Sequence, residues 1–171
     1  MTSIAVAAGK SDYEAFACLV REYAAWLSER MAKEAWFIEA VLKHQSLEHE
    51  LATLEATYGP PRGLILLARD GEGVAGGVAL RHLGAGVCEM KRMFIRDHYR
   101  GQGLGRKLCQ TVIAAARDEG YRVMRLDTLP RLTEAIAMYE TFGFRKCPPY
   151  HEYAADLMPH ILFMEMEIGQ A

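Results

Sequence analysis

The stretch YRGQGLG, residues 99–105, determines how the rest of the chain is interpreted. Three glycines stand at every second position, with Arg100 before them and Arg106 and Lys107 after them. Without Cβ atoms the main chain can approach a ligand closely and its amides can converge. The stretch lies between an expected strand and the start of an expected helix, where free amides and the helix dipole favour an anion. It predicts a phosphate-binding turn, the alternative being a tight strand-to-helix turn with a solvated basic rim.

The positive charge around this turn is local. Residues 91–107 contain six basic side chains and one acidic one, whereas the whole chain has a net charge of -2 and a pI near 6.3. The near-neutral total indicates neither a nucleic acid nor a membrane as partner. Two nucleotide motifs are excluded, because Arg106 stands where a dinucleotide fingerprint needs its third glycine, and Gly105 is not followed by the Lys-Ser/Thr of a P-loop.

Length and composition predict a single domain over residues 1–171. The chain has 51% hydrophobic residues, enough for one core. Its N-terminus lacks the basic start and long apolar stretch of a secretory signal, so we expect a cytoplasmic protein. Four cysteines lack the close pairing of a zinc site or disulfide framework, which predicts free thiols and no metal. They are Cys18, Cys88, Cys109 and Cys147.

Hydrophobic periodicity predicts an α+β, mixed α/β fold around one sheet. Helices are expected at residues 11–30, 36–41, 46–58, 104–120 and 135–142, and strands at 64–68, 74–80, 87–95, 122–128 and 161–168. Asp70-Gly71-Glu72-Gly73 is typical of a hairpin turn between the first two strands.

Three segments in order carry a family resemblance. Residues 100–105 match the pattern R/Q-x-x-G-x-G/A, the strand EMKRMFI at 89–95 precedes them, and AIAMYETFGF at 135–144 matches A-x-x-x-Y-E-x-x-G-F. Together they resemble the GNAT superfamily of CoA-dependent N-acetyltransferases over roughly residues 62–146. The resemblance implies a mostly antiparallel sheet of six or seven strands flanked by helices and splayed at the acetyl-CoA site. Leu132 departs from the pattern, because many members carry an asparagine there.

The resemblance also implies acetyl-CoA as cosubstrate, with a direct attack by an amine on the thioester. The pyrophosphate is expected at Arg100, Gly101, Gln102, Gly103, Leu104, Gly105 and Arg106. The acyl and pantetheine end is expected along Met93, Phe94 and Ile95. In this scheme the backbone N–H of Met93 stabilises the oxyanion.

Two side chains are the catalytic candidates besides Met93. Tyr139 matches the family's general acid, although an isolated tyrosine on a helix is more often a buried aromatic with a hydrogen-bonded hydroxyl. Glu89 matches the base of some members, and strand alternation places it on the face of Met93 unless a bulge intervenes. The alternative for Glu89 is an ion pair with Lys91.

The sequence leaves the amine acceptor open between small molecules and peptides. His82, His98 and His151 are further candidate bases or ordinary surface residues, and residues 148–153 form either part of an acceptor pocket or a packed loop. Residues 11–58 carry nine acidic and four basic side chains, which indicates a cationic acceptor or simply a solvated helical face. A homodimer is compatible with the fold, and a non-catalytic acyl-CoA-binding module is the alternative to an enzyme.

Overall fold

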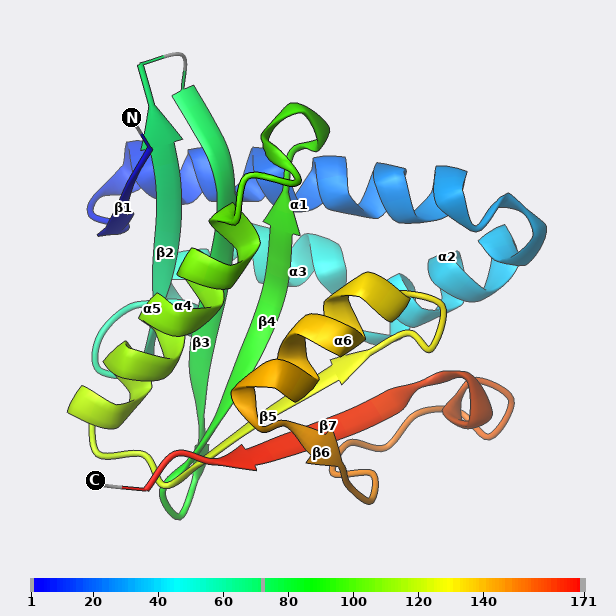
Figure 1. Ribbon diagram of the computed structural model, residues 1–171. Coiled ribbons are helices and arrows are strands. Elements are labelled where there is room, and N and C mark those ends of the chain that lie inside the picture. The colour runs from blue at the N-terminus through cyan, green and yellow to red at the C-terminus, as the bar shows by residue number, and fades with distance from the viewer. Residues whose placement is uncertain (1, 72, 170–171) are drawn as a thin grey trace.

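A computed structural model describes residues 2–71 and 73–169, and one seven-stranded sheet runs through them (Figure 1). The strand order is β1-β2-β3-β4-β5-β7-β6, and every neighbouring pair is antiparallel except β4 with β5. The strands are β1 Ser3–Val6, β2 Gly63–Asp70, β3 Gly73–Gly84, β4 Val87–Ile95, β5 Val123–Thr128, β6 Arg145–Lys146 and β7 Leu162–Glu167. The predicted mixed fold with a mostly antiparallel sheet is confirmed.

Helices cover both faces of the sheet. In Figure 1, α5 and α6 lie in front of it and the first four helices lie behind it. The helices are α1 Lys10–Arg30, α2 Ala35–His44, α3 Leu47–Ala52, α4 Leu54–Tyr58, α5 Leu104–Asp118 and α6 Thr133–Phe142. Short 3-10 turns occur at Ala32–Glu34, Asp97–Tyr99 and Met158–His160.

The core divides into one cluster on each face and a third at the far end. Leu108 and Val112 of α5 pack against Met90 on the front face, while Phe16 of α1 packs against Leu67 on the back face. Alternate residues along a strand point to opposite faces, so a sheet buried on both sides reads as continuous apolar runs. The third cluster joins α2 to β7 and the loop before it.

The structure differs from the sequence expectations in three places. Neither β1 nor the two-residue β6 was expected, and the helix expected over 46–58 is broken at Thr53 into α3 and α4. The expected turn after Asp70 includes Glu72, which lies outside the described residues.

The four cysteines are free thiols, and Cys88 and Cys109 are buried. In the described part of the chain, no helix has the length and apolarity needed to cross a membrane.

Candidate active site

Strand β4 carries a bulge where the site begins. Its register against β3 shifts between Gly77 and Ala79, and Arg92 and Met93 lie opposite this shift. Arg92 has φ +56°, the left-handed region that non-glycine residues rarely adopt. A bulge adds one residue to a strand, so it reverses the inward and outward alternation beyond it.

The bulge overturns one expectation about Glu89. Met93 packs against the cluster under α5, whereas Glu89 bonds to Arg81 on the face covered by α1 to α4. The two side chains therefore lie on opposite faces, and the expectation that they share one is wrong. Its physical reason is the extra residue at Arg92, which simple period-two counting cannot detect.

Strands β4 and β5 separate immediately after they meet. In the described residues they pair only along Val87–Glu89 and Val123–Arg125, and Figure 1 shows them diverging from that point. A cavity of about 440 Å³ lies in the gap. Residues 90–95 of β4 and 126–128 of β5 line it, together with side chains from α1, α2 and α6. The cavity thus passes from one face of the sheet to the other, as the predicted splay requires.

The glycine turn opens toward this cavity. Gly101 and Gly103 have φ of +75° and +77°, and no atom lies within 4 Å of the place where their Cβ atoms would stand. Among the described residues, no acceptor bonds the main-chain amides of residues 101–106; the first such bond runs from Lys107 N to Gly103 O at 3.1 Å. Free amides at the start of a 15-residue helix form an anion site.

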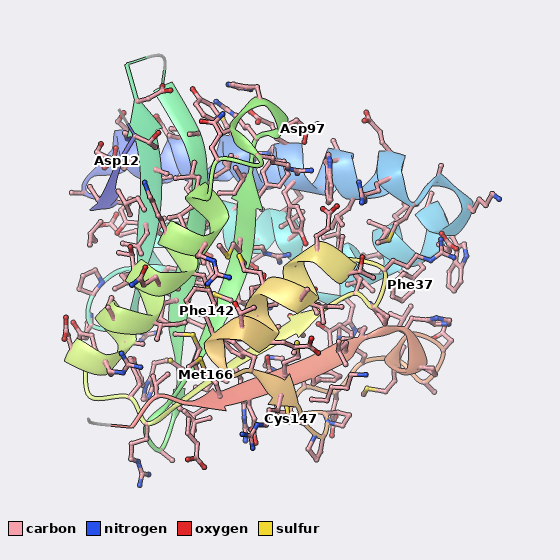
Figure 2. The ribbon with its side chains drawn as sticks, viewed as in Figure 1. Asp12, Phe37, Asp97, Phe142, Cys147 and Met166 are labelled. Atoms are coloured by element: carbon pink, nitrogen blue, oxygen red, sulfur yellow. The ribbon has the colours of Figure 1, made fainter. Side chains whose placement is uncertain are left out.

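Arg100 is fixed by three groups beside the turn. Its Nε donates to the carbonyl oxygen of Ile95 at 2.9 Å, and Nη1 lies 3.0 Å from Asp97 Oδ1. Figure 2 labels Asp97, which lies in the loop between β4 and α5. The guanidinium carbon of Arg100 stands 4.3 Å from the ring centroid of Trp26 on α1. These contacts connect the end of β4 to α1 and keep one positive charge at the mouth of the cavity.

Nine of the ten residues predicted to bind the cofactor line the cavity. They are Met93, Phe94, Ile95, Arg100, Gly101, Gly103, Leu104, Gly105 and Arg106. Arg106 also donates to Thr141 Oγ1 at 3.0 Å and lies over the ring of Phe142 on α6. Phe142 is labelled in Figure 2. The tenth, Gln102, is exposed and donates to the carbonyl oxygen of His98 at 3.0 Å.

Tyr139 lies on α6 in the wall of the cavity. Its side chain is 7% exposed and its ring packs edge-on against Phe144 at 5.7 Å. Burial raises the pKa of Tyr139 well above its ordinary value, and nearby Tyr23 and Cys109 add to the effect. The phenol therefore keeps its proton at neutral pH, as a proton donor must.

Glu89 is fully buried and surrounded by polar partners. Arg81 Nε donates to Oε2 at 2.5 Å, while His151 Nε2 and the Tyr150 hydroxyl lie 2.7 and 3.0 Å from Oε1. Burial is the largest influence and opposes ionisation, but Lys91, His151 and Arg81 together hold the pKa of Glu89 at about 2. Its carboxylate is not among the described groups that line the cavity.

Comparisons with known proteins agree with this geometry. The sequence profile of the acetyltransferase (GNAT) family matches residues 19–144. The chain belongs to the GNAT family. An uncharacterized N-acetyltransferase of Schizosaccharomyces pombe is 38% identical over 131 residues, covering 75% of this chain and 78% of the relative.

Two solved structures resemble this GNAT protein. One, named as an acyl-CoA N-acyltransferase from Klebsiella pneumoniae, has a TM-score of 0.73 and 26% identity, with 99% of each chain covered. The other, a GNAT acetyltransferase from Elizabethkingia anophelis with acetyl-CoA bound, has a TM-score of 0.54 and 21% identity, covering 61% of this chain and 75% of that one. The protein is thus an N-acetyltransferase by family.

Sequence reasoning missed two polar groups of this GNAT site. Asp127 on β5 and Gln45 after α2 line the cavity. Tyr153 also lines it and belongs to residues 148–153, which the sequence offered as part of an acceptor pocket or as a packed loop. Lys91 lines it too, although the sequence indicated it only as a partner of Glu89. Charged side chains inside otherwise apolar strands are the signal that points to Lys91 and Asp127, because a buried charge needs a partner or a function.

The histidine candidates lie elsewhere. The ring of His82 packs at a tilt against Tyr121 and that of His98 at a tilt against Tyr99, while His151 bonds to Glu89; none of the described lining residues is a histidine. Within residues 2–71 and 73–169, no group of three or more His, Cys, Asp or Glu side chains is arranged to hold a metal ion.

Proposed function

We propose that the protein transfers an acetyl group from acetyl-CoA to a primary amine by direct attack. The observation that carries the proposal is the cavity, which connects the open glycine turn on one face to the space under α1 and α2 on the other. A thioester arm running from the turn along β4 brings its acyl carbon to the gap between the strands. An amine can then approach that carbon from the opposite face.

The chain has the groups that acetyl-CoA requires. The free amides at residues 101–106 and the open space over Gly101 and Gly103 fit a diphosphate. Beyond Glu89, β4 is separated from β5, so the backbone of Phe94 and Ile95 can bond an extended pantetheine arm as an added strand would. The acetyl-CoA in the similar Elizabethkingia anophelis protein supports this cosubstrate.

The chemical step assigns one task to each of two residues. The amine nitrogen forms a bond to the carbonyl carbon, and the resulting oxyanion accepts a hydrogen bond from the Met93 amide, which lies at the bulge where regular pairing is interrupted. The carbon–sulfur bond then breaks, and Tyr139 gives its proton to the leaving thiolate. An acceptor that binds as an ammonium releases two protons, one of which restores Tyr139.

We place Glu89 as a positioning residue rather than the base. Deprotonating an amine of pKa about 10.4 at pH 7 costs about 4.6 kcal/mol, so a group in contact with the acceptor is expected to help. The carboxylate of Glu89 already receives bonds from Arg81, Tyr150 and His151. Those contacts tie the loop that carries Tyr153 to the sheet, which shapes the acceptor side of the cavity.

The test combines a binding and a turnover measurement. Calorimetry with CoA should give a saturable isotherm, and a panel of primary amines with acetyl-CoA should release free thiol above the background hydrolysis rate. Binding without thiol release for any amine would favour the acyl-CoA-binding module instead. Absence of heat with CoA would overturn the proposal.

A further inference from the structure

The acceptor side of the cavity contains a loosely paired cation and anion. Lys91 on β4 and Asp127 on β5 face each other across the gap, with side chains 6% and 11% exposed. Lys91 Nζ lies 3.9 Å from Asp127 Oδ1 and also 3.9 Å from Glu89 Oε1. A charged hydrogen bond is shorter, about 2.7–2.9 Å, so all three groups keep bonding capacity. A ligand with charges of its own can therefore insert between Lys91 and Asp127.

Asp127 is oriented by a chain of hydrogen bonds. The Tyr153 hydroxyl donates to Asp127 Oδ2 at 2.5 Å, and Gln45 Nε2 donates to Tyr153 at 2.7 Å. The other oxygen of Asp127, Oδ1, points to Lys91. Gln45 Oε1 is buried and has no hydrogen-bond partner in the described part of the chain. A buried acceptor without a donor is costly, so a donor such as an ammonium group is expected from a ligand.

The charges around this pair are balanced. Arg92 bonds Glu50 through two nitrogens at 3.0 and 2.9 Å, and Arg81 pairs with Glu89. Lys91 and Asp127 also balance each other in charge, although they are not in hydrogen-bond contact. Desolvating an uncompensated charge is unfavourable, so this site disfavours a polycation and accepts a ligand of zero net charge.

Most of the remaining wall on this side is apolar. Leu27 of α1, Val41 and Ile38 of α2, and Ile161 before β7 line the cavity around the polar groups, and the charged side chain that α1 adds is a cation, Arg30, which lies over the Trp26 ring. Such a surface fits a hydrocarbon or aromatic group and offers no partner to a second ammonium.

We infer that the acceptor is an α-amino acid with an apolar side chain, bound as its zwitterion. Its carboxylate lies against Lys91, its amino group against Asp127 and Gln45, and its side chain against the apolar wall. This inference rests on the proposed function and specifies its acceptor. During transfer the ammonium gives one proton to Asp127, whose carboxylic acid later releases it to water, and the second proton, lost from nitrogen as the amide forms, restores Tyr139.

The test compares amino acids with amines that lack only the carboxylate. L-Phenylalanine and L-leucine are assayed beside 2-phenylethylamine and isoamylamine, with spermidine as the polycation, by thiol release from acetyl-CoA. At least one amino acid should exceed its own decarboxylated amine by about tenfold or more in kcat/KM, and spermidine should stay at background. This comparison uses the unmodified protein, so it does not depend on whether a variant folds.

A variant assigns the preference to a residue. Lys91→Gln should lower kcat/KM for the amino acid far more than for its decarboxylated amine, so that the ratio between the two loses most of the amino acid's advantage. Lys146→Gln, an exposed lysine on β6, is the control and should change neither. Equal or faster turnover of the decarboxylated amines or spermidine would overturn the inference alone. If none of the amines or amino acids caused thiol release above background, the proposed function itself would be overturned.

Discussion

At the scale of single residues, burial keeps the phenol of Tyr139 protonated. Because its pKa is raised well above the ordinary value, the phenol is protonated throughout the neutral range. We expect Tyr139→Phe to slow acetyl transfer by at least about tenfold, since a general acid contributes roughly 10²–10⁴. Thiol release should report this loss, while CoA affinity by calorimetry changes less than about twofold. Tyr121→Phe, which alters a tyrosine whose ring contacts His82, is the control. An unchanged rate in Tyr139→Phe would remove Tyr139 from the mechanism.

A second prediction at the residue scale concerns the contribution of Glu89 to the free energy of unfolding. Its pKa falls from an ordinary 4.5 to about 2, so its contribution is complete above pH 4.5 and is lost as the pH falls from there toward 2. The shift corresponds to about 3 kcal/mol. Glu89→Gln should therefore lower the free energy of unfolding near pH 7 by about that amount and flatten its pH dependence between 4.5 and 2. Denaturant unfolding at a series of pH values measures both effects.

A control and a kinetic readout separate the two roles of Glu89. Glu165→Gln removes a half-buried pair with Arg125 and should cost no more than about 1 kcal/mol. If Glu89 positions the loop, Glu89→Gln raises KM for the acceptor more than it lowers kcat. A large fall in kcat with an unchanged KM would instead assign the base role to Glu89.

At the scale of elements, the turn before α5 is the part whose shape matters most for CoA. Gly103 has φ +77° and an open Cβ position at the helix N-terminus, and Gly120 has φ +81° and an equally open position after its C-terminus. Replacing either glycine by alanine adds about 1–2 kcal/mol of backbone strain, because a Cβ atom disfavours this positive φ. Gly103→Ala should also raise the Kd for CoA by about tenfold, because its methyl group intrudes on the phosphate site. Gly120→Ala should shift the melting temperature similarly but leave the Kd unchanged; equal Kd values would place the phosphates elsewhere.

The elements that sequence patterns predicted are those with strong periodicity. The 15-residue helix α5 and the strands around it were found from apolar spacing, and the glycine turn from composition. β1 was missed because it is a four-residue, mostly exposed edge strand, and β6 because two residues carry no period. The bulge was missed because Arg92 gives no local signal for a positive φ. That one residue decides which face Glu89 occupies, so the base assignment depended on information that only tertiary packing supplies.

At the scale of the whole molecule, one sheet separates two layers of helices and is interrupted where β4 and β5 diverge. All strands of the described residues belong to this sheet, and the organisation of residues 1–171 as one domain stays a prediction. Helices α5 and α6 form the side proposed for CoA, and α1 and α2 form the side proposed for the acceptor. The charged groups of the acceptor side come from both strands that border the gap, Lys91 from β4 and Asp127 from β5.

Because the two substrates reach the gap from opposite faces of the sheet, the architecture predicts the kinetic mechanism. Both substrates can be bound at once, and none of the four cysteines is among the described residues that line the cavity, so no thiol is placed there to accept the acyl group first. We therefore expect double-reciprocal plots that intersect, as in a ternary-complex mechanism, rather than the parallel lines of a ping-pong reaction. Mass spectrometry after incubation with acetyl-CoA alone should show an unmodified chain. A stoichiometric acetyl adduct that an added amine discharges would mean that the acyl group passes through the protein, and direct attack across the gap would then be wrong.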